Sequence, residues 1–296
     1  MKSKDITQKM LERYNDVFAD ILNVLLFNGK RIVEENALID TPTDSALKID
    51  GDIYSQDRDV AKYWKNSQIN IALFGLENQT TPEKLMPLRV IGYDGAEYVR
   101  QAKKENSKEV IYPVITLVLY FGYNSRWNQP KSLFELLEID EMIKPYVNDF
   151  KMNLFEIAYL DREKIDMFES DFWILADYLY QMRVNKNYVA GDTVIEHVDE
   201  LLMLMSAMTN DYRFEETINE VKGKEHVTMC EVLDRVEARG IAKGREEGIK
   251  EGIKKGIKEG TVNVLISLVK DGILSISDAA KRAGMSDTEF KKYANM

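Results

Sequence analysis

The sequence predicts an α/β protein, in which a mixed sheet with flanking helices is followed by an all-helical C-terminal extension. Residues 112–122 (YPVITLVLYFG) are dense in apolar side chains, as is typical of a strand buried on both faces. In the first 160 residues, segments with apolar residues at helical spacing occur together with strand-like segments, whereas only helical spacing follows. Hydrophobic residues at 45% and charged residues at 30% are typical of a globular domain.

The chain is predicted to begin with a helix over residues 6–27, where apolar side chains recur at helical spacing. Asn28-Gly29 then ends this helix. A short strand is expected over 31–38, followed by a polar loop with turn signals at Thr41-Pro42 and Asp50-Gly51.

Two strands are expected next, over residues 58–65 and 68–77, and their short link suits a hairpin. The second of them has more apolar residues and is predicted to lie centrally in the sheet. Four further elements complete the α/β part: a helix at 88–104, a strand at 112–122, a helix at 132–137 and a strand at 153–160.

The predicted organisation has four segments: a core at 1–160, a helical extension at 161–227, a long helix at 228–260 and three short helices at 261–296 that resemble a helix-turn-helix unit. In the long helix a glycine recurs every fourth residue from Gly240 to Gly260. These glycines form either a seam for close packing or a flexible, solvated helix. Because each costs about 1 kcal/mol of helix stability relative to alanine, we favour packing and expect a homo-oligomer formed through the C-terminal helices.

Composition excludes several classes of protein. No run of about twenty apolar residues is present, so no membrane span is expected, and the charged N-terminus lacks the features of a signal peptide. A cytoplasmic protein is therefore predicted. The single cysteine, Cys230, excludes an internal disulfide and a cysteine-based zinc cluster. A net charge of −10 argues against non-specific coating of DNA, although it is compatible with cleavage by a carboxylate-rich metal site.

Two acidic residues point to metal chemistry. Asp59 and Glu77 lie on strands joined by a hairpin, and paired carboxylates of this kind suit Mg²⁺ with water and phosphate as further ligands. Gln79 projects from the same strand face as Glu77, and Asp16 on the first helix offers a further carboxylate. The alternative is an ordinary surface ladder, in which the acids pair with lysines such as Lys62.

Several blocks of the first 160 residues resemble a known family, in order along the chain. They include YNDVFADILNVLLF, INIALFGLENQT, MPLRVIGYDGAEY and YPVITLVLYFGYNSRWNQPKSL. Glu77-Asn78-Gln79-Thr80 after an apolar strand, and Arg89 with Tyr93, are similar to motifs of the recombination-promoting nuclease (Rpn)/putative transposase family. That family belongs to the PD-(D/E)XK nuclease superfamily, so the resemblance implies a restriction-endonuclease-like sheet.

The resemblance also implies an activity: a DNA endonuclease, associated with recombination or mobile elements, that depends on Mg²⁺ and accepts Mn²⁺. Asp59 and Glu77 are then the metal ligands and Asp16 the helix-borne acid. Gln79 occupies the position of the superfamily's catalytic lysine. A neutral amide stabilises developing negative charge less well than a lysine. An alternative therefore stays open, in which the protein keeps the nuclease fold with little or no turnover and serves as a DNA-binding or assembly module.

Four further residues are expected to contact the DNA substrate. Lys62 and Arg89 could supply the positive charge that Gln79 lacks, and Tyr93 belongs to the same motif as Arg89. Arg126 lies in a loop after the most apolar strand, where it could contact a DNA phosphate.

Overall fold

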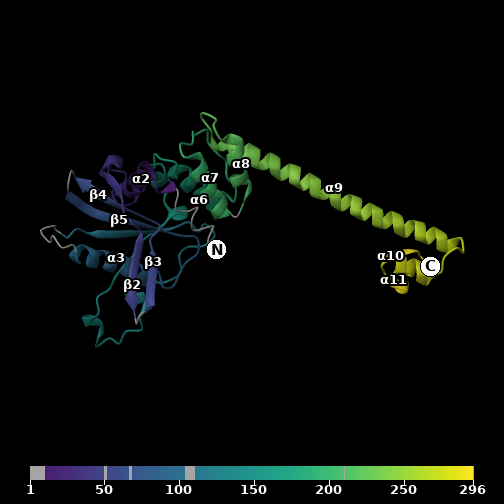
Figure 1. The fold of residues 1–296 in the computed structure, drawn as a ribbon, viewed down its shortest axis with the longest axis horizontal. Coiled ribbons are helices and arrows are strands. Elements are labelled where there is room, and N and C mark those ends of the chain that lie inside the picture. The colour runs from purple at the N-terminus through teal and green to yellow at the C-terminus, as the bar shows by residue number, and fades with distance from the viewer. Residues whose placement is uncertain (1–10, 50–51, 67–68, 104–110, 210, 296) are drawn as a thin grey trace. The chain divides into compact units, whose positions relative to one another are not determined.

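The computed structural model describes residues 11–49, 52–66, 69–103, 111–209 and 211–295 (Figure 1). The chain divides into two compact units, Met1–Asp234 and Arg235–Met296, and each is described by itself. Among the described residues no helix is both long and apolar enough to cross a membrane.

A five-stranded mixed sheet forms the centre of the first unit, with the order β1-β4-β5-β6-β7. The strands are β1 (Leu38–Asp40), β4 (Val60–Asn66), β5 (Ile69–Gln79), β6 (Val114–Tyr120) and β7 (Asn153–Glu156). The pairs β1/β4 and β4/β5 are antiparallel, whereas β5/β6 and β6/β7 are parallel. The direction of pairing therefore changes at β5, which is the central strand, and the predicted mixed sheet is confirmed.

Helices cover the sheet on both sides (Figure 1). On one side lies α2 (Asn15–Leu25), which buries its apolar residues, and its Phe18 ring contacts the ammonium group of Lys62 on β4. On the other side α3 (Met86–Lys103) connects β5 to β6 and packs Met86 and Val90 against β6. Consecutive side chains of β5 thus alternate between an α2 side and an α3 side.

The segment before β4 differs from the prediction. The strand expected at 31–38 is wrong, because a 3-10 turn (Glu35–Ala37) precedes the short β1. The polar loop expected up to residue 56 is wrong as well: β2 (Asp44–Ile49) and β3 (Asp52–Asp57) form a separate antiparallel hairpin beside α3. Its sequence is rich in aspartate and serine, and backbone pairing holds the two strands together. The predicted turn at Asp50-Gly51 lies outside the described residues.

Short helices complete the first unit: α4 (Leu133–Leu136), α5 (Arg162–Ile165), α6 (Phe172–Asn185), α7 (Val198–Thr209) and α8 (Arg213–Val221). The predicted helical extension is therefore interrupted between α5 and α6. Asp20 of α2 accepts hydrogen bonds there from the backbone N–H groups of Glu169 and Ser170, both at 2.9 Å. These bonds hold the helical extension against α2.

The second unit contains most of α9 (Met229–Lys270), together with α10 (Ile276–Ala283) and α11 (Asp287–Tyr293). The helix break expected after residue 260 is wrong, because α9 continues to Lys270. Ser275 and Ser286 cap α10 and α11 with their hydroxyl groups. Phe290 and Ala280 belong to a small apolar core that also includes Val262 of α9. The predicted all-helical C-terminal region is confirmed.

Candidate functional site

The register of the β4/β5 hairpin places Asp59 beside Glu77. Val60 pairs with Leu76, so the residue before Val60 falls next to the residue after Leu76. The Asp59 carboxylate accepts a hydrogen bond from the backbone N–H of Asn78 at 2.7 Å. Both acids therefore lie at the carboxyl end of β5, where the pairing changes from antiparallel to parallel. Open α/β sheets commonly bind their ligands outside the carboxyl ends of their strands.

Glu77 is only 2% exposed, and its side chain lies on the α3 side of the sheet. Its Oε1 atom accepts hydrogen bonds from Arg89 of α3 at 2.6 Å and from the Gln79 amide at 3.2 Å. Arg89 also donates to Glu83 at 2.7 Å and to the Tyr93 hydroxyl at 2.8 Å. The structure thus brings Glu77, Gln79, Arg89 and Tyr93 into one hydrogen-bonded group.

A second buried glutamate, Glu12, lies on the α2 side of the sheet. Its side chain is fully buried and accepts a hydrogen bond from the Asn78 amide at 3.1 Å. Residues 12–14 form a turn and a bend, so the helix expected over 6–27 is interrupted there and α2 begins at Asn15. On an uninterrupted helix Glu12 would lie opposite the apolar face, so the sequence contains no signal for its burial.

Burial and mutual repulsion dominate the electrostatics of these acids. Burial, followed by the charge of Asp59, raises the pKa of Glu12 to about 8. The same two causes, in the same order, raise the pKa of Glu77 to about 8, although the Arg89 guanidinium acts in the opposite direction. The Oε2 atoms of Glu12 and Glu77 are buried and accept no hydrogen bond from any described residue. The positive charge of Arg89 therefore does not balance the charge that Asp59, Glu77 and Glu12 would carry if all three were ionised.

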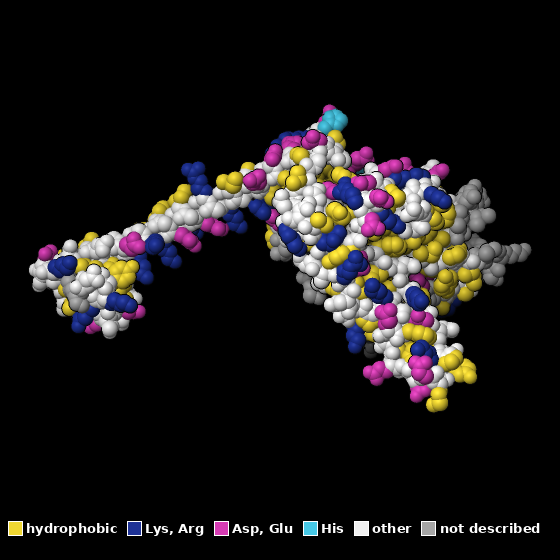
Figure 2. All heavy atoms as spheres, turned by 180° about the vertical axis from the view of Figure 1, so that it is seen from behind, with side chains coloured by type: hydrophobic (Ala, Val, Ile, Leu, Met, Phe, Trp, Pro, Cys, Tyr) yellow, Lys and Arg dark blue, Asp and Glu magenta, His cyan; other side chains and the backbone are white. Residues whose placement is uncertain are grey.

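The structure places the other candidate residues elsewhere. Lys62 is completely buried on the α2 side, where it donates to the Arg13 carbonyl at 2.7 Å and pairs with Asp40. The expectation that Lys62 contacts the substrate does not fit this burial. Arg126 has a side chain that is 66% exposed, and it pairs with Glu156 at 3.3 Å. On the face drawn in Figure 2, basic and acidic side chains of the first unit are intermixed.

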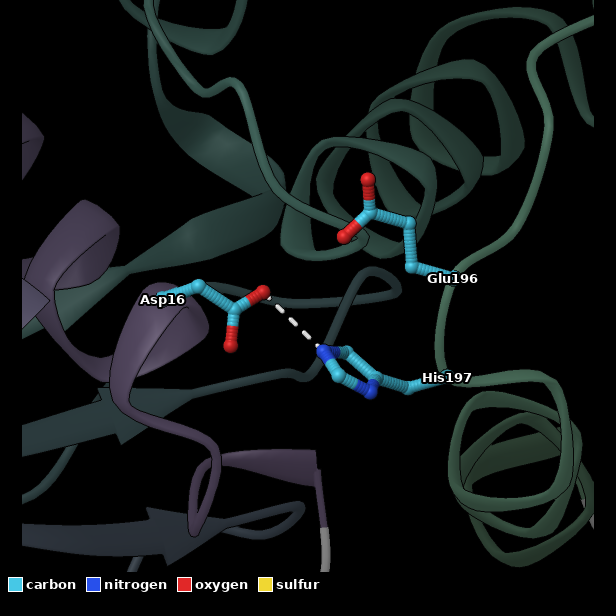
Figure 3. A group of neighbouring side chains, drawn as sticks. All are labelled: Asp16, Glu196 and His197. Atoms are coloured by element: carbon cyan, nitrogen blue, oxygen red, sulfur yellow. Dashed lines mark hydrogen bonds and ion pairs between the residues drawn. The ribbon is translucent and has the colours of Figure 1, made fainter.

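Asp16, the expected helix-borne acid, belongs to a different group of side chains (Figure 3). Its Oδ2 atom lies 3.0 Å from Nε2 of His197, which stands in the segment before α7. Glu196 is adjacent, and one potential ligand atom from each of the three residues lies within 4.8 Å of the other two. Asp16 is therefore grouped with His197 and Glu196, whereas Glu12, also near the start of α2, is the acid that is influenced by the charge of Asp59.

Comparison with known proteins identifies the family. The sequence pattern of a family described as "Putative transposase, YhgA-like" matches residues 64–212, which is half of the chain. No curated protein and no solved structure matches the chain. The matched region contains Glu77, Gln79, Arg89, Glu196 and His197, together with the strands β5 to β7. This match shows that the chain belongs to the YhgA-like putative transposase family, as its resemblance to the Rpn/putative transposase group predicts.

Proposed function

We propose that the protein is a Mg²⁺-dependent DNA endonuclease that acts in recombination or in the movement of mobile elements. One observation carries the proposal: the buried Glu77 carboxylate lies beside Asp59 at the end of β5, with an Oε2 atom that accepts no hydrogen bond from the described residues. Arg89 compensates Oε1, but leaving a buried polar atom such as Oε2 without a hydrogen bond costs about 1–3 kcal/mol. A carboxylate in this position therefore suits a cation.

Asp59 and Glu77 are the residues that would hold Mg²⁺, and Mn²⁺ has similar ligand preferences. Two carboxylates fit Mg²⁺ because this ion usually keeps several water ligands and binds substrate phosphate as well. When bound, Mg²⁺ supplies an activated water and stabilises the charge of the attacked phosphodiester. Glu12 lies close enough to Asp59 for the charge of Asp59 to help raise its pKa, and a cation bound at this end of the sheet would favour the ionised form of Glu12.

Gln79 and Arg89 divide the work of the lysine that the superfamily places at this position. The Gln79 amide already donates to Glu77, so it orients that carboxylate and can donate to a phosphate oxygen. Arg89 is 30% exposed and reaches the same Oε1 atom, and its one N–H that is not directed at Glu77, Glu83 or Tyr93 can contact the scissile phosphate. Tyr93 is buried beneath Arg89 and fixes the orientation of its guanidinium.

Cleavage of supercoiled plasmid by the purified protein, with Mg²⁺, Mn²⁺ or a chelator, tests this function. Glu77→Gln and Asp59→Asn keep the shape of the side chains and should lower the cleavage rate by about a hundredfold or more, since each removes a charge that acts on the transition state. Glu83→Gln is the matched control, because Glu83 also pairs with Arg89 but is half-exposed. This variant should cleave at close to the parent rate.

The remaining outcomes separate the proposal from its alternative. Metal-dependent cleavage that persists at the parent rate in both Glu77→Gln and Asp59→Asn would contradict the assigned site. DNA binding without cleavage by the parent, in either metal, would favour a DNA-binding or assembly module that has kept the nuclease fold. Arg89→Gln adds a diagnostic: it should lower kcat while DNA binding in Ca²⁺ is largely retained.

A further inference from the structure

We propose that Asp16, Glu196 and His197 form a second metal site, which binds a transition-metal cation of the Zn²⁺ class. Asp16 lies in the first turn of α2, whereas Glu196 and His197 precede α7. Figure 3 shows the three side chains converging from these two segments. The Nε2 atom of His197 and the Oδ2 atom of Asp16 are 3.0 Å apart, and potential ligand atoms of all three residues lie within 4.8 Å of one another.

Buried hydrogen bonds hold the two ligands that precede α7. The Asp171 carboxylate is buried and accepts the backbone N–H of Glu196 at 3.1 Å and that of His197 at 2.6 Å. The His197 ring is fixed as well, because it stacks on Tyr14 with a centroid distance of 3.7 Å and an interplanar angle of 20°. Because the backbone at both ligands and the His197 ring are already held, metal binding needs to order little more than the exposed Glu196 side chain.

The charge around these residues favours a cation. The carboxylates of Asp16 and Glu196 both lie close to the His197 ring, and Glu200 accepts a hydrogen bond from the Tyr14 hydroxyl at 2.9 Å. This bond, with the charges of Glu200, Asp16 and Asp199, helps raise the pKa of Tyr14. Within the described parts of the chain, neither Asp16 nor Glu196 forms an ion pair with a lysine or an arginine. A divalent ion would offset this excess of negative charge.

The imidazole distinguishes this site from the Asp59–Glu77 pair. Mg²⁺ prefers oxygen ligands only, whereas Zn²⁺, Co²⁺ and Ni²⁺ readily accept a mixture of imidazole and carboxylate. Three protein ligands also suit Zn²⁺, which then takes water in its fourth position. Because both ligand segments belong to the first unit, a bound ion would fasten the start of α2 to the helical extension.

The test is a titration of the full-length protein with Zn²⁺ by calorimetry, in the presence of excess Mg²⁺. We expect binding of one Zn²⁺ per chain, with an affinity that falls at least about tenfold in His197→Gln and in Glu196→Gln. The chain has two histidines, so His226→Asn is a matched control. Asparagine tolerates the positive φ of 60° at that position, and the variant should bind Zn²⁺ like the parent.

Two further measurements separate a metal site from a simple ion pair. Co²⁺ added in place of Zn²⁺ should give visible absorption bands that are lost in His197→Gln, and Zn²⁺ should raise the Tm of the parent but not of this variant. Glu196 is exposed, so Glu196→Gln tests the site even where a change at His197 impairs folding. Absence of Zn²⁺ binding by the parent overturns the proposal, as does equal binding by His197→Gln or an equal loss in His226→Asn. The proposal also fails if His197→Gln lowers the Tm, relative to the parent, by the same amount with and without Zn²⁺. Asp16 and His197 would then form an ion pair only.

Discussion

At the scale of single residues, two buried glutamates link the stability of this molecule to pH. Glu77 lies at the end of an apolar strand, and desolvation opposes its ionisation more strongly than Arg89 supports it. Glu12 has the same imbalance on the other side of the sheet, where its one described side-chain partner is the neutral amide of Asn78. Each of these residues therefore binds its proton more tightly in the folded chain than in the unfolded chain, and their ionisation is linked to folding.

This linkage gives a pH-dependent prediction. In a chelator, unfolded Glu12 and Glu77 lose their protons near the ordinary pKa of 4.5, whereas the folded residues keep them until about pH 8. A raised pKa contributes stability that is complete below pH 4.5 and is lost as the pH rises through 8. The Tm should therefore fall over this interval, and Mg²⁺ should raise it by several degrees at about pH 8 but much less at about pH 5.5.

Scanning calorimetry at several pH values measures both effects. Glu77→Gln removes one of the two groups, so its Tm should depend less on pH and respond less to Mg²⁺. Glu83→Gln should retain most of both responses, because Glu83 is half-exposed. An equal pH dependence in Glu77→Gln and in the parent would show that this carboxyl group does not carry the linkage.

At the scale of the elements, a buried network attaches the turn before β4, which contains Asp59, to helix α3. Arg58 is 3% exposed and pairs with Asp94 of α3 at 2.8 Å, and Asp94 also accepts a hydrogen bond from Thr116 of β6 at 2.6 Å. Arg58 passes directly over Gly75 of β5, where a Cβ atom would lie 2.6 Å from its Cδ. The glycine therefore makes room for the arginine that precedes Asp59.

Gly75→Ala should destabilise the fold by about 1–3 kcal/mol, because the new methyl group must displace an anchored and buried side chain. Gly95→Ala on α3 is the matched comparison, since no atom lies within 4 Å of its added Cβ. That change should stabilise the protein by up to about 1 kcal/mol through helix propensity. Urea unfolding measures both differences. A neutral Gly75→Ala would show that Arg58 can relocate without loss.

At the scale of the whole chain, the elements that the sequence predicts correctly are those whose apolar pattern lies within one continuous segment. The apolar runs of β5 and β6 and the periodicity of α3 are encoded within single segments, and the predicted hairpin brings Asp59 next to Glu77, whose metal-binding role remains a prediction. The β2/β3 hairpin has no apolar alternation to reveal it. The pairing of Asp16 with His197 joins residues 181 positions apart, so only tertiary structure brings them together. Glu12 was missed for a similar reason, because its burial depends on the interruption before α2.

The glycine repeat of α9 leads to the last prediction, which concerns assembly. Ile249, Ile253 and Ile257 accompany the glycines and are each more than half exposed, and Cβ atoms added at Gly248, Gly252 or Gly256 would meet no atom within 4 Å. A repeat of four residues exceeds the 3.6 residues of a helical turn, so the stripe winds around the helix and suits a right-handed crossing of two helices. We propose that a second copy of the chain covers this stripe.

Substituting these three glycines by alanine distinguishes the two interpretations of the repeat. In a solvated helix each alanine should stabilise the helix by about 1 kcal/mol relative to glycine, and the mass of the particle in solution should not change. In a packed seam the added methyl groups keep the two backbones apart, so the oligomer should dissociate at concentrations where the parent stays assembled. Sedimentation velocity over a range of concentrations measures this shift. The triple variant Lys250→Ala, Lys254→Ala and Lys258→Ala has the same spacing on another face of α9, and dissociation of that control as well would locate the contact away from the glycine stripe.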